Sequence, residues 1–178
     1  MNYASIRTCD IANGEGVRVS LFVSGCTHRC KGCFNVEAQA FDYGEPFTRE
    51  VEDRLLAALE PDYITGLTLL GGEPMEPLNQ RVLVPFLKRF RAKFGDAKTL
   101  WVYTGCLLED LRGRCAWVRE DLSSFDSYWR TEVTDDFLAM TDVLVDGPFV
   151  EALKDISLKF RGSSNQRIIN MKTGETLK

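Results

Sequence analysis

The sequence predicts an α/β protein with a mostly parallel sheet, folded as one domain over residues 1–178. Short segments rich in β-branched and aromatic residues alternate with segments of helical period, in the order strand, helix, strand, helix, strand. That alternation is typical of parallel strands joined by right-handed helical crossovers. A single domain of 178 residues buries roughly 70% of the surface that its unfolded chain would expose, so it folds without staples.

Composition and charge narrow the class of protein. The chain is 44% hydrophobic and 27% charged, as in an ordinary soluble protein, and its net charge of -4 argues against a dedicated nucleic-acid binder. Met1 to Asp10 lacks the basic start and apolar core of a signal peptide, and no apolar run approaches the roughly 18 residues of a membrane span. We therefore expect a cytoplasmic protein with no membrane partner, in which clustered cysteines serve metal or redox chemistry.

The first strand and the first helix are predicted by their hydrophobic periods. Val17–Val23 alternates polar and apolar residues and is rich in β-branched side chains, which predicts a strand. Thr48 is typical of a helix N-cap, with Glu50 and Glu52 near the positive end of the helix dipole. The helix ends at Pro61, and its apolar face consists of Val51, Leu55, Leu56 and Leu59.

A second strand and a second helix follow. Residues 66–70 read as a strand that ends in Gly-Gly-Glu-Pro at residues 71–74. Residues 79–93 carry a helical apolar stripe, with Pro85 as a late start or a kink. The basic residues of this helix favour a solvated face over a docking patch; they are Arg81, Lys88, Arg89, Arg91 and Lys93.

The second half of the chain is less regular. Thr99–Tyr103 predicts a third strand and residues 143–145 a fourth. Residues 112–141 are expected to form a variable insertion of loop and short helices, because they are polar and aromatic without a clear period. Ligands of parallel sheets bind at the carboxyl ends of the strands. The two unusual loops, residues 25–35 and 71–74, both leave strands at that end, so we expect them to face one cavity.

Three of the chain's six cysteines lie in the stretch GCTHRCKGCFN at residues 25–35. The spacing Cys26-x3-Cys30-x2-Cys33 lets one looped backbone aim three thiolates at a common centre, which suits zinc or an iron–sulfur cluster. A [4Fe-4S] cluster ordinarily takes four cysteines, so three would leave one iron open. Because His28 is the single histidine, a Cys2His2 zinc finger is excluded.

An alternative interpretation of the cysteines is a structural zinc site with a fourth ligand from elsewhere. The candidates for that ligand are His28, Cys9, Cys106 and Cys115. His28 is poorly placed for it, since it lies between the first two cysteines of a short loop. The other three cysteines stand singly, and each is expected to be a small buried hydrophobic residue rather than a ligand.

The motif CxxxCxxC after a strand, with GGEP after the next strand, resembles the radical S-adenosylmethionine (SAM) enzymes. The resemblance implies an incomplete (β/α) barrel in which Cys26, Cys30 and Cys33 hold one [4Fe-4S] cluster, and SAM binds the open iron. It further implies that the methionyl end of SAM contacts Gly71, Gly72 and Glu73, and that its adenine contacts Gly32, Cys33 and Phe34. The chain departs from the family pattern at Gly32, where many members carry an aromatic residue.

Further motifs follow in order along nearly the whole chain: DIANGEGVR at residues 10–18, WVYTG at 101–105, DVLVDGPF at 142–149 and RGSSNQR at 161–167. With them the chain resembles the family of activases that act on anaerobic (class III) ribonucleotide reductases. This implies reductive cleavage of SAM, a glycyl radical on the large subunit of the reductase as protein substrate, and a low-potential electron donor such as flavodoxin.

Two rival hypotheses stay open at this point. One remains in the superfamily: an activase of another glycyl-radical enzyme, or a radical-SAM enzyme that converts a small molecule. The other is a non-enzymatic zinc or iron–sulfur binding module. If the chain is an enzyme, its catalytic groups would be the cluster and the cofactor, with no further catalytic side chain expected.

Overall fold

The computed structural model describes residues 1–113 and 128–177. Its strands and helices follow one another as β1 Asn2–Asp10, β2 Val17–Val23, the 3-10 helix η1 Glu37–Gln39, β3 Glu45–Pro46, α1 Arg49–Ala58, β4 Ile64–Gly71, α2 Pro77–Phe94, β5 Thr99–Tyr103, α3 Leu108–Leu111, α4 Thr134–Met140, β6 Val143–Asp146, the 3-10 helix η2 Glu151–Leu153, β7 Arg167–Asn170 and β8 Thr176–Leu177.

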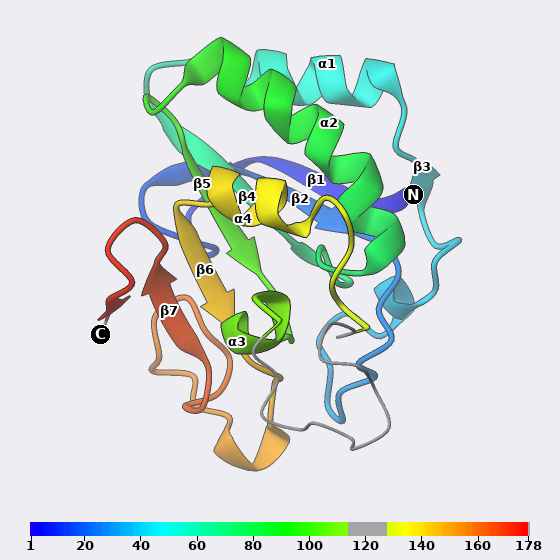
Figure 1. Ribbon diagram of the computed structural model, residues 1–178, viewed down its shortest axis with the longest axis vertical. Helices are drawn as coiled ribbons and strands as arrows, with labels where there is room; N and C mark the ends of the chain where they lie inside the picture. Colours follow the sequence, from blue (N-terminus) through cyan, green and yellow to red (C-terminus); the bar gives the residue numbers. More distant parts are fainter. Residues whose placement is uncertain (114–127, 178) are drawn as a thin grey trace.

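The strands form one eight-stranded mixed sheet in the order β3-β1-β2-β4-β5-β6-β7-β8. The pairs β2–β4, β4–β5 and β5–β6 are parallel, and the pairs toward both edges are antiparallel. The prediction of an α/β fold with a largely parallel sheet is therefore confirmed. Because the parallel strands all run the same way, β2, β4, β5 and β6 deliver their following loops to one edge of the sheet (Figure 1).

The helices α1, α2 and α4 cover one face of the sheet (Figure 1). Alternate residues of each strand pack against them in one large core; its strand members include Val19, Leu21, Leu67, Leu69, Leu100, Val102 and Leu144. The opposite face carries a smaller apolar cluster of Trp101, Val143, Val145 and Ile168. Within the described ranges, no helix is both long and apolar enough to cross a membrane.

The predicted elements agree with the structure except at the start and in the insertion. Thr99–Tyr103 is a strand over the expected residues, and the other predicted strands are present, β4 and β6 being longer than expected. β1 was not predicted, because its buried and exposed residues do not alternate regularly. Within the expected insertion, α4 forms at Thr134–Met140, while residues 114–127, including Cys115, lie outside the described residues.

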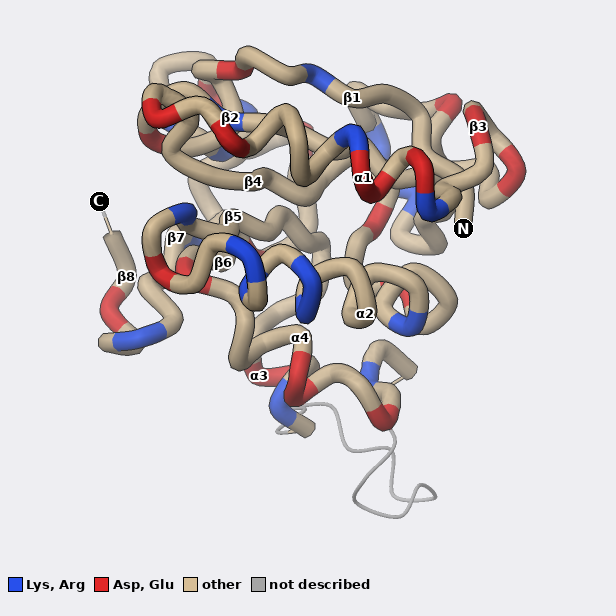
Figure 2. Tube along the Cα trace, turned by 90° about the horizontal axis from the view of Figure 1, so that it is seen from above, with Lys and Arg blue, Asp and Glu red and all other residues tan. Residues whose placement is uncertain are grey.

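The basic residues of α2 are engaged in ion pairs rather than left free for a partner. Arg89 pairs with Glu52 and Asp53 of α1, Lys88 pairs with Asp136 of α4, and Arg91 pairs with Asp142. Figure 2 marks these charges along the helices. The Lys88–Asp136 pair is exposed and contributes little stability, whereas Arg89 and Arg91 are half-buried and hold α2 to its neighbours.

Candidate metal centre

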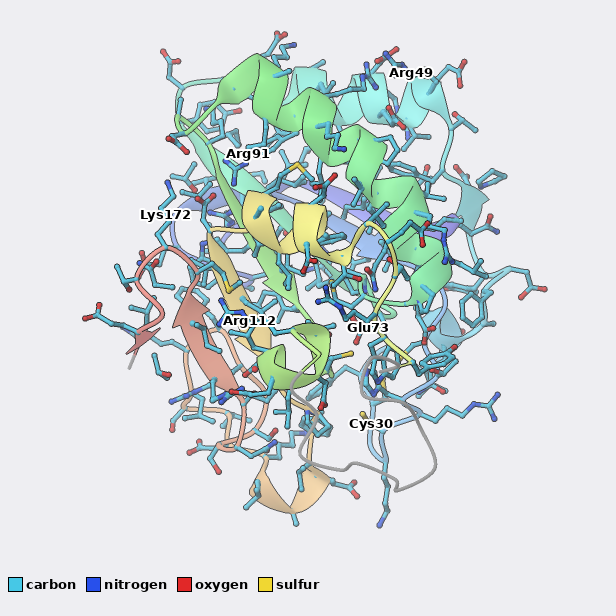
Figure 3. The ribbon with its side chains drawn as sticks, in the orientation of Figure 1. Cys30, Arg49, Glu73, Arg91, Arg112 and Lys172 are labelled. Atoms are coloured by element: carbon cyan, nitrogen blue, oxygen red, sulfur yellow. The ribbon has the colours of Figure 1, made fainter. Side chains whose placement is uncertain are left out.

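The two loops that the sequence singled out meet beyond the carboxyl ends of β2 and β4. The cysteine loop, residues 25–35, follows β2, and the glycine–glutamate loop, residues 71–76, follows β4. The Glu73 amide donates to the Gly25 carbonyl oxygen at 2.8 Å, and the Gly72 amide donates to that of Val23 at 2.7 Å. Figure 3 shows Glu73 and Cys30 at this end of the sheet, far from Arg49 and Arg91. The expectation that both loops face one cavity is confirmed.

The two glycines are required by the close approach of the loops. A Cβ at Gly72 would lie 2.6 Å from the Gly25 carbonyl oxygen and 2.8 Å from that of Ala38. Gly71 has a φ of +110°, and a Cβ there would lie 2.8 Å from the β2 backbone. Contact with the cysteine loop therefore already explains why a side chain at Gly72 is excluded, before any contact with a bound cofactor.

Cys26, Cys30 and Cys33 are free, partly buried thiols that line one cavity of about 200 Å³. Gly71, Gly72 and Glu73 line the same cavity. Burial, followed by the charge of Glu73, raises the pKa of Cys26 to about 12, and burial raises that of Cys30. Since metals bind the thiolate, cluster assembly here must displace protons. Three free thiols on one cavity, with no disulfide among them, fit the predicted cluster.

The residue before the third cysteine explains the departure from the family pattern. Gly32 has a φ of +72°, and a Cβ there would lie 2.9 Å from Glu151 Oε1. A large side chain is therefore unfavourable at this position. The aromatic residue comes two positions later, at Phe34, which lines the cavity. The centroid of the Phe34 ring lies 5.4 Å from that of Phe149 and 4.9 Å from Lys154 Nζ. Cys33 and Phe34 line the cavity, whereas Gly32 is not part of its wall.

Glu73 is 1% exposed, and its carboxylate is hydrogen-bonded within the chain. Oε1 accepts from the Met75 amide at 2.8 Å, and Oε2 accepts from the Gly105 amide at 2.8 Å and from His28 Nε2 at 2.9 Å. Burial acts to lower the His28 pKa, but the hydrogen bond and charge of Glu73 outweigh it and the net shift is upward. Glu73 thus ties the cysteine loop to the loops after β4 and β5.

The remaining cysteines differ from one another. Cys106 is buried, as expected, while Cys9 is exposed and the expectation of burial is wrong there, because β1 is an edge region of the sheet. The Cys106 sulfur lies 3.6 Å from His28 Nε2, and these atoms with the Glu73 carboxylate lie within 4.8 Å of one another. Burial raises the pKa of the Cys106 thiol, as it does for Cys26 and Cys30.

Three cavity features were not predicted as site residues. The Tyr103 hydroxyl is buried and has no hydrogen-bond partner within the described part of the chain, although Tyr103 lines the cavity. Gly162 and Gln166 also line it, which brings part of the RGSSNQR motif to the rim. The orphaned hydroxyl marks a place where a polar ligand group fits.

Glu76 was also missed, because it follows the GGEP motif and nothing in its local sequence indicates burial. It is 1% exposed and binds the cysteine loop: its Oε1 accepts from the Thr27 amide at 2.6 Å and from Thr27 Oγ1 at 2.7 Å. The signal that could have found it is the spacing of the two glutamates, three residues apart in a loop that faces the cysteines.

The Asp146 carboxylate of the DVLVDG motif stabilises the segments that form the far wall of the cavity. It is fully buried, accepts from the Leu108 amide at 2.9 Å and from Arg167 Nε at 2.9 Å, and fixes the loop after β5 to β7. Gln166 extends this support, since its amide group bonds the Gly147 carbonyl oxygen and the Gly162 amide. These motifs hold the far wall of the cavity.

Comparison with known proteins matches the chain over nearly its whole length. A family model described as "4Fe-4S single cluster domain" matches residues 12–169. A protein of Pasteurella multocida is 42% identical over 94% of this chain and 96% of its own length. One of Escherichia coli K12 is 37% identical over 97% and 100%, and one of phage T4 is 34% identical over 94% and 93%. All three are named anaerobic ribonucleoside-triphosphate reductase-activating protein.

Proposed function

This chain belongs to the family of anaerobic ribonucleoside-triphosphate reductase-activating proteins, and on that basis we propose that it activates such a reductase by radical-SAM chemistry. The observation that carries the proposal is the meeting of two loops, one with three free thiols and one with Gly71 and Gly72, around one cavity. We propose that the strands around this cavity act as the incomplete (β/α) barrel of the superfamily.

Cys26, Cys30 and Cys33 would hold one [4Fe-4S] cluster, with SAM on its open iron. When bound, these groups would supply the reductive cleavage of SAM and, through it, the removal of a hydrogen atom from a glycine of the reductase. The role of the chain itself is to bind and orient the cluster and SAM, and to exclude water from them.

The residues around the cavity divide the binding of SAM between them. Gly71, Gly72, Cys33 and Phe34 line the cavity. The backbone of the two glycines would border the methionyl end of SAM, Cys33 and Phe34 would border its adenine, and Gly32 would support the loop outside the cavity wall. Because the Glu73 carboxylate already accepts three hydrogen bonds, nearby backbone carbonyls are the better acceptors for the ammonium group of SAM. The buried Tyr103 hydroxyl is a donor for a polar group of the cofactor.

Protection of the radical favours a protein substrate. A cavity of about 200 Å³ that holds the cluster and SAM has no room for a further small molecule. A radical must be shielded from water, so a partner that covers the opening while it inserts its glycine would complete the site. The large subunit of the reductase fits this role, with a low-potential donor such as flavodoxin supplying the electron.

The test is anoxic. The chain is reconstituted with iron and sulfide and mixed with SAM, a reductant and the reductase, and methionine release is followed together with the EPR doublet of a glycyl radical. We expect the doublet only when all components are present, and its loss in Cys26→Ala but not in Cys9→Ala. A cluster-bearing chain that converts a small molecule and never forms the doublet would favour the small-molecule enzyme. A colourless, zinc-loaded chain would favour the binding module.

A further inference from the structure

Glu76 holds a buried negative charge against the first turn of the cysteine loop. It is the N-cap residue of α2 and 1% exposed. One carboxylate oxygen accepts both the amide and the hydroxyl of Thr27, at 2.6 and 2.7 Å, while the other lies 3.4 Å from the Tyr128 hydroxyl. Thr27 directly follows Cys26, so this contact fixes the backbone next to the first thiol.

Among the described residues, the cation nearest to the two buried glutamates is His28, which pairs with Glu73 rather than with Glu76. Within residues 1–113 and 128–177, Glu73 pairs with His28, but no ion pair is formed by Glu76. A buried carboxylate is unfavourable unless it is hydrogen-bonded or paired. Two hydrogen bonds from Thr27 and the positive end of the 18-residue helix α2 stabilise it here. Two buried carboxylates therefore face one imidazole under the cysteine loop, and the charge of Glu76 is uncompensated by any ion pair in the described part of the chain.

That charge reaches the thiol that the cluster would use. Glu76 accepts from the amide and the hydroxyl of Thr27, the residue that directly follows Cys26, so its carboxylate lies beside the first ligand of the cluster. An added electron on a cluster held by Cys26 would be repelled by this carboxylate. The reduction potentials of iron–sulfur clusters respond to net charge, hydrogen bonds and solvent exposure around them.

We propose that Glu76 is a positioning residue that fixes the cysteine loop through Thr27, and that its uncompensated charge lowers the reduction potential of the cluster. The inference rests on the proposed function, which places the cluster on Cys26, Cys30 and Cys33. A lower potential makes the reduced cluster a stronger reductant, which is what cleavage of a sulfonium requires.

Two variants separate the charge from the position. Glu76→Gln removes the charge but keeps an amide oxygen that accepts from Thr27, so we expect a loaded cluster with a more positive midpoint potential. Thr27→Val keeps the charge but removes one hydrogen bond to it, so we expect faster loss of iron to a chelator and no positive shift of the potential. Thr27→Ser should restore iron retention. Glu132→Gln, at an exposed ion pair with Arg81, is the control and should change neither measurement.

The potential is measured by anoxic redox titration of the wild-type and variant proteins, followed by EPR, which reports loaded clusters alone. A loaded Glu76→Gln cluster with the wild-type potential would overturn the role of the charge, and wild-type iron retention in Thr27→Val would overturn the positioning role. If Glu76→Gln does not bind a cluster, the potential of Glu76→Asp, which keeps the charge, is measured instead. A wild-type potential in Glu76→Asp supports the inference, and a positive shift refutes it. Failure of the wild-type chain itself to bind a cluster would instead refute the proposed function.

Discussion

The two ends of the sheet each bury a charge, and they do so with opposite signs. At the amino ends of the strands lies Arg18, 1% exposed, which donates to Thr68 Oγ1 at 2.7 Å and to the carbonyl oxygens of Leu67 and Thr99 at 2.8 and 2.9 Å. At the carboxyl ends lie the carboxylates of Glu73 and Glu76. Burial lowers the Arg18 pKa to about 10, which still leaves it charged at neutral pH.

The difference lies in what each charge joins. Arg18 belongs to β2 and bonds residues of β4 and β5, so it ties three neighbouring strands to one another. The two glutamates join loops instead of strands, and their partners are residues of the cysteine loop and the loop after β5. The amino end therefore stabilises the fold, and the carboxyl end holds the groups to which we assign the chemistry.

The largest effect is expected from the cysteines at the carboxyl end. Cys30→Ala should abolish cluster binding and SAM cleavage, because a cluster with two protein thiolates lacks a ligand that the loop cannot replace. Its thermal stability without iron should stay close to that of the wild type, since Cys30 is only partly buried. Iron content and thermal unfolding are the measurements, and full iron loading in Cys30→Ala would contradict the assignment.

At the amino end, a substitution should reduce the stability of the fold and leave cluster binding at the carboxyl end unaffected. Arg18→Met leaves the buried oxygen acceptors of Arg18 without donors, which we expect to lower the free energy of unfolding by about 1–3 kcal/mol, the cost of unsatisfied buried polar groups. Arg81→Met, at an exposed pair, should change stability little. Urea unfolding measures both. A loss below about 1 kcal/mol in Arg18→Met would show that Arg18 is dispensable to the fold.

The features that could be predicted from the sequence are those with a local signal. The three cysteines were found because their spacing is local, and GGEP was found because it ends a periodic strand. Arg18 and Glu76 were not found, since their burial depends on which strands become neighbours. β1 was missed for a similar reason: its exposed and buried residues do not alternate regularly, and register shifts interrupt its pairing with β2.

Gly72→Ala probes the contact between the two loops. Its Cβ would press on the carbonyl oxygens of Gly25 and Ala38, and these backbone atoms have little room to shift. We expect a loss of about 1–3 kcal/mol together with weaker iron binding, because the cysteine loop must move. Gly95→Ala is the control for iron binding: its φ of +53° makes alanine unfavourable for stability, but nothing lies within 4 Å of its Cβ, so iron binding should be unchanged. Normal iron content in Gly72→Ala would show that the loops are not held by this contact.

The smallest effect is expected at Cys106. Cys106→Ala removes one buried sulfur, which should cost about 1 kcal/mol or less, and should leave the iron content intact. Its proximity to His28 and Glu73 makes it the sharpest check on a rival metal site formed by these three residues. Metal analysis after reconstitution decides, and loss of bound metal in Cys106→Ala would favour that rival.

The central claim is that three cysteines leave one iron of the cluster open for SAM. The most direct measurement is the EPR spectrum of the reduced, reconstituted chain recorded with and without SAM. We predict that SAM changes the spectrum of the wild-type cluster, because it binds the open iron, and that the Cys9→Ala cluster responds in the same way. A spectrum that is identical with and without SAM would contradict the account.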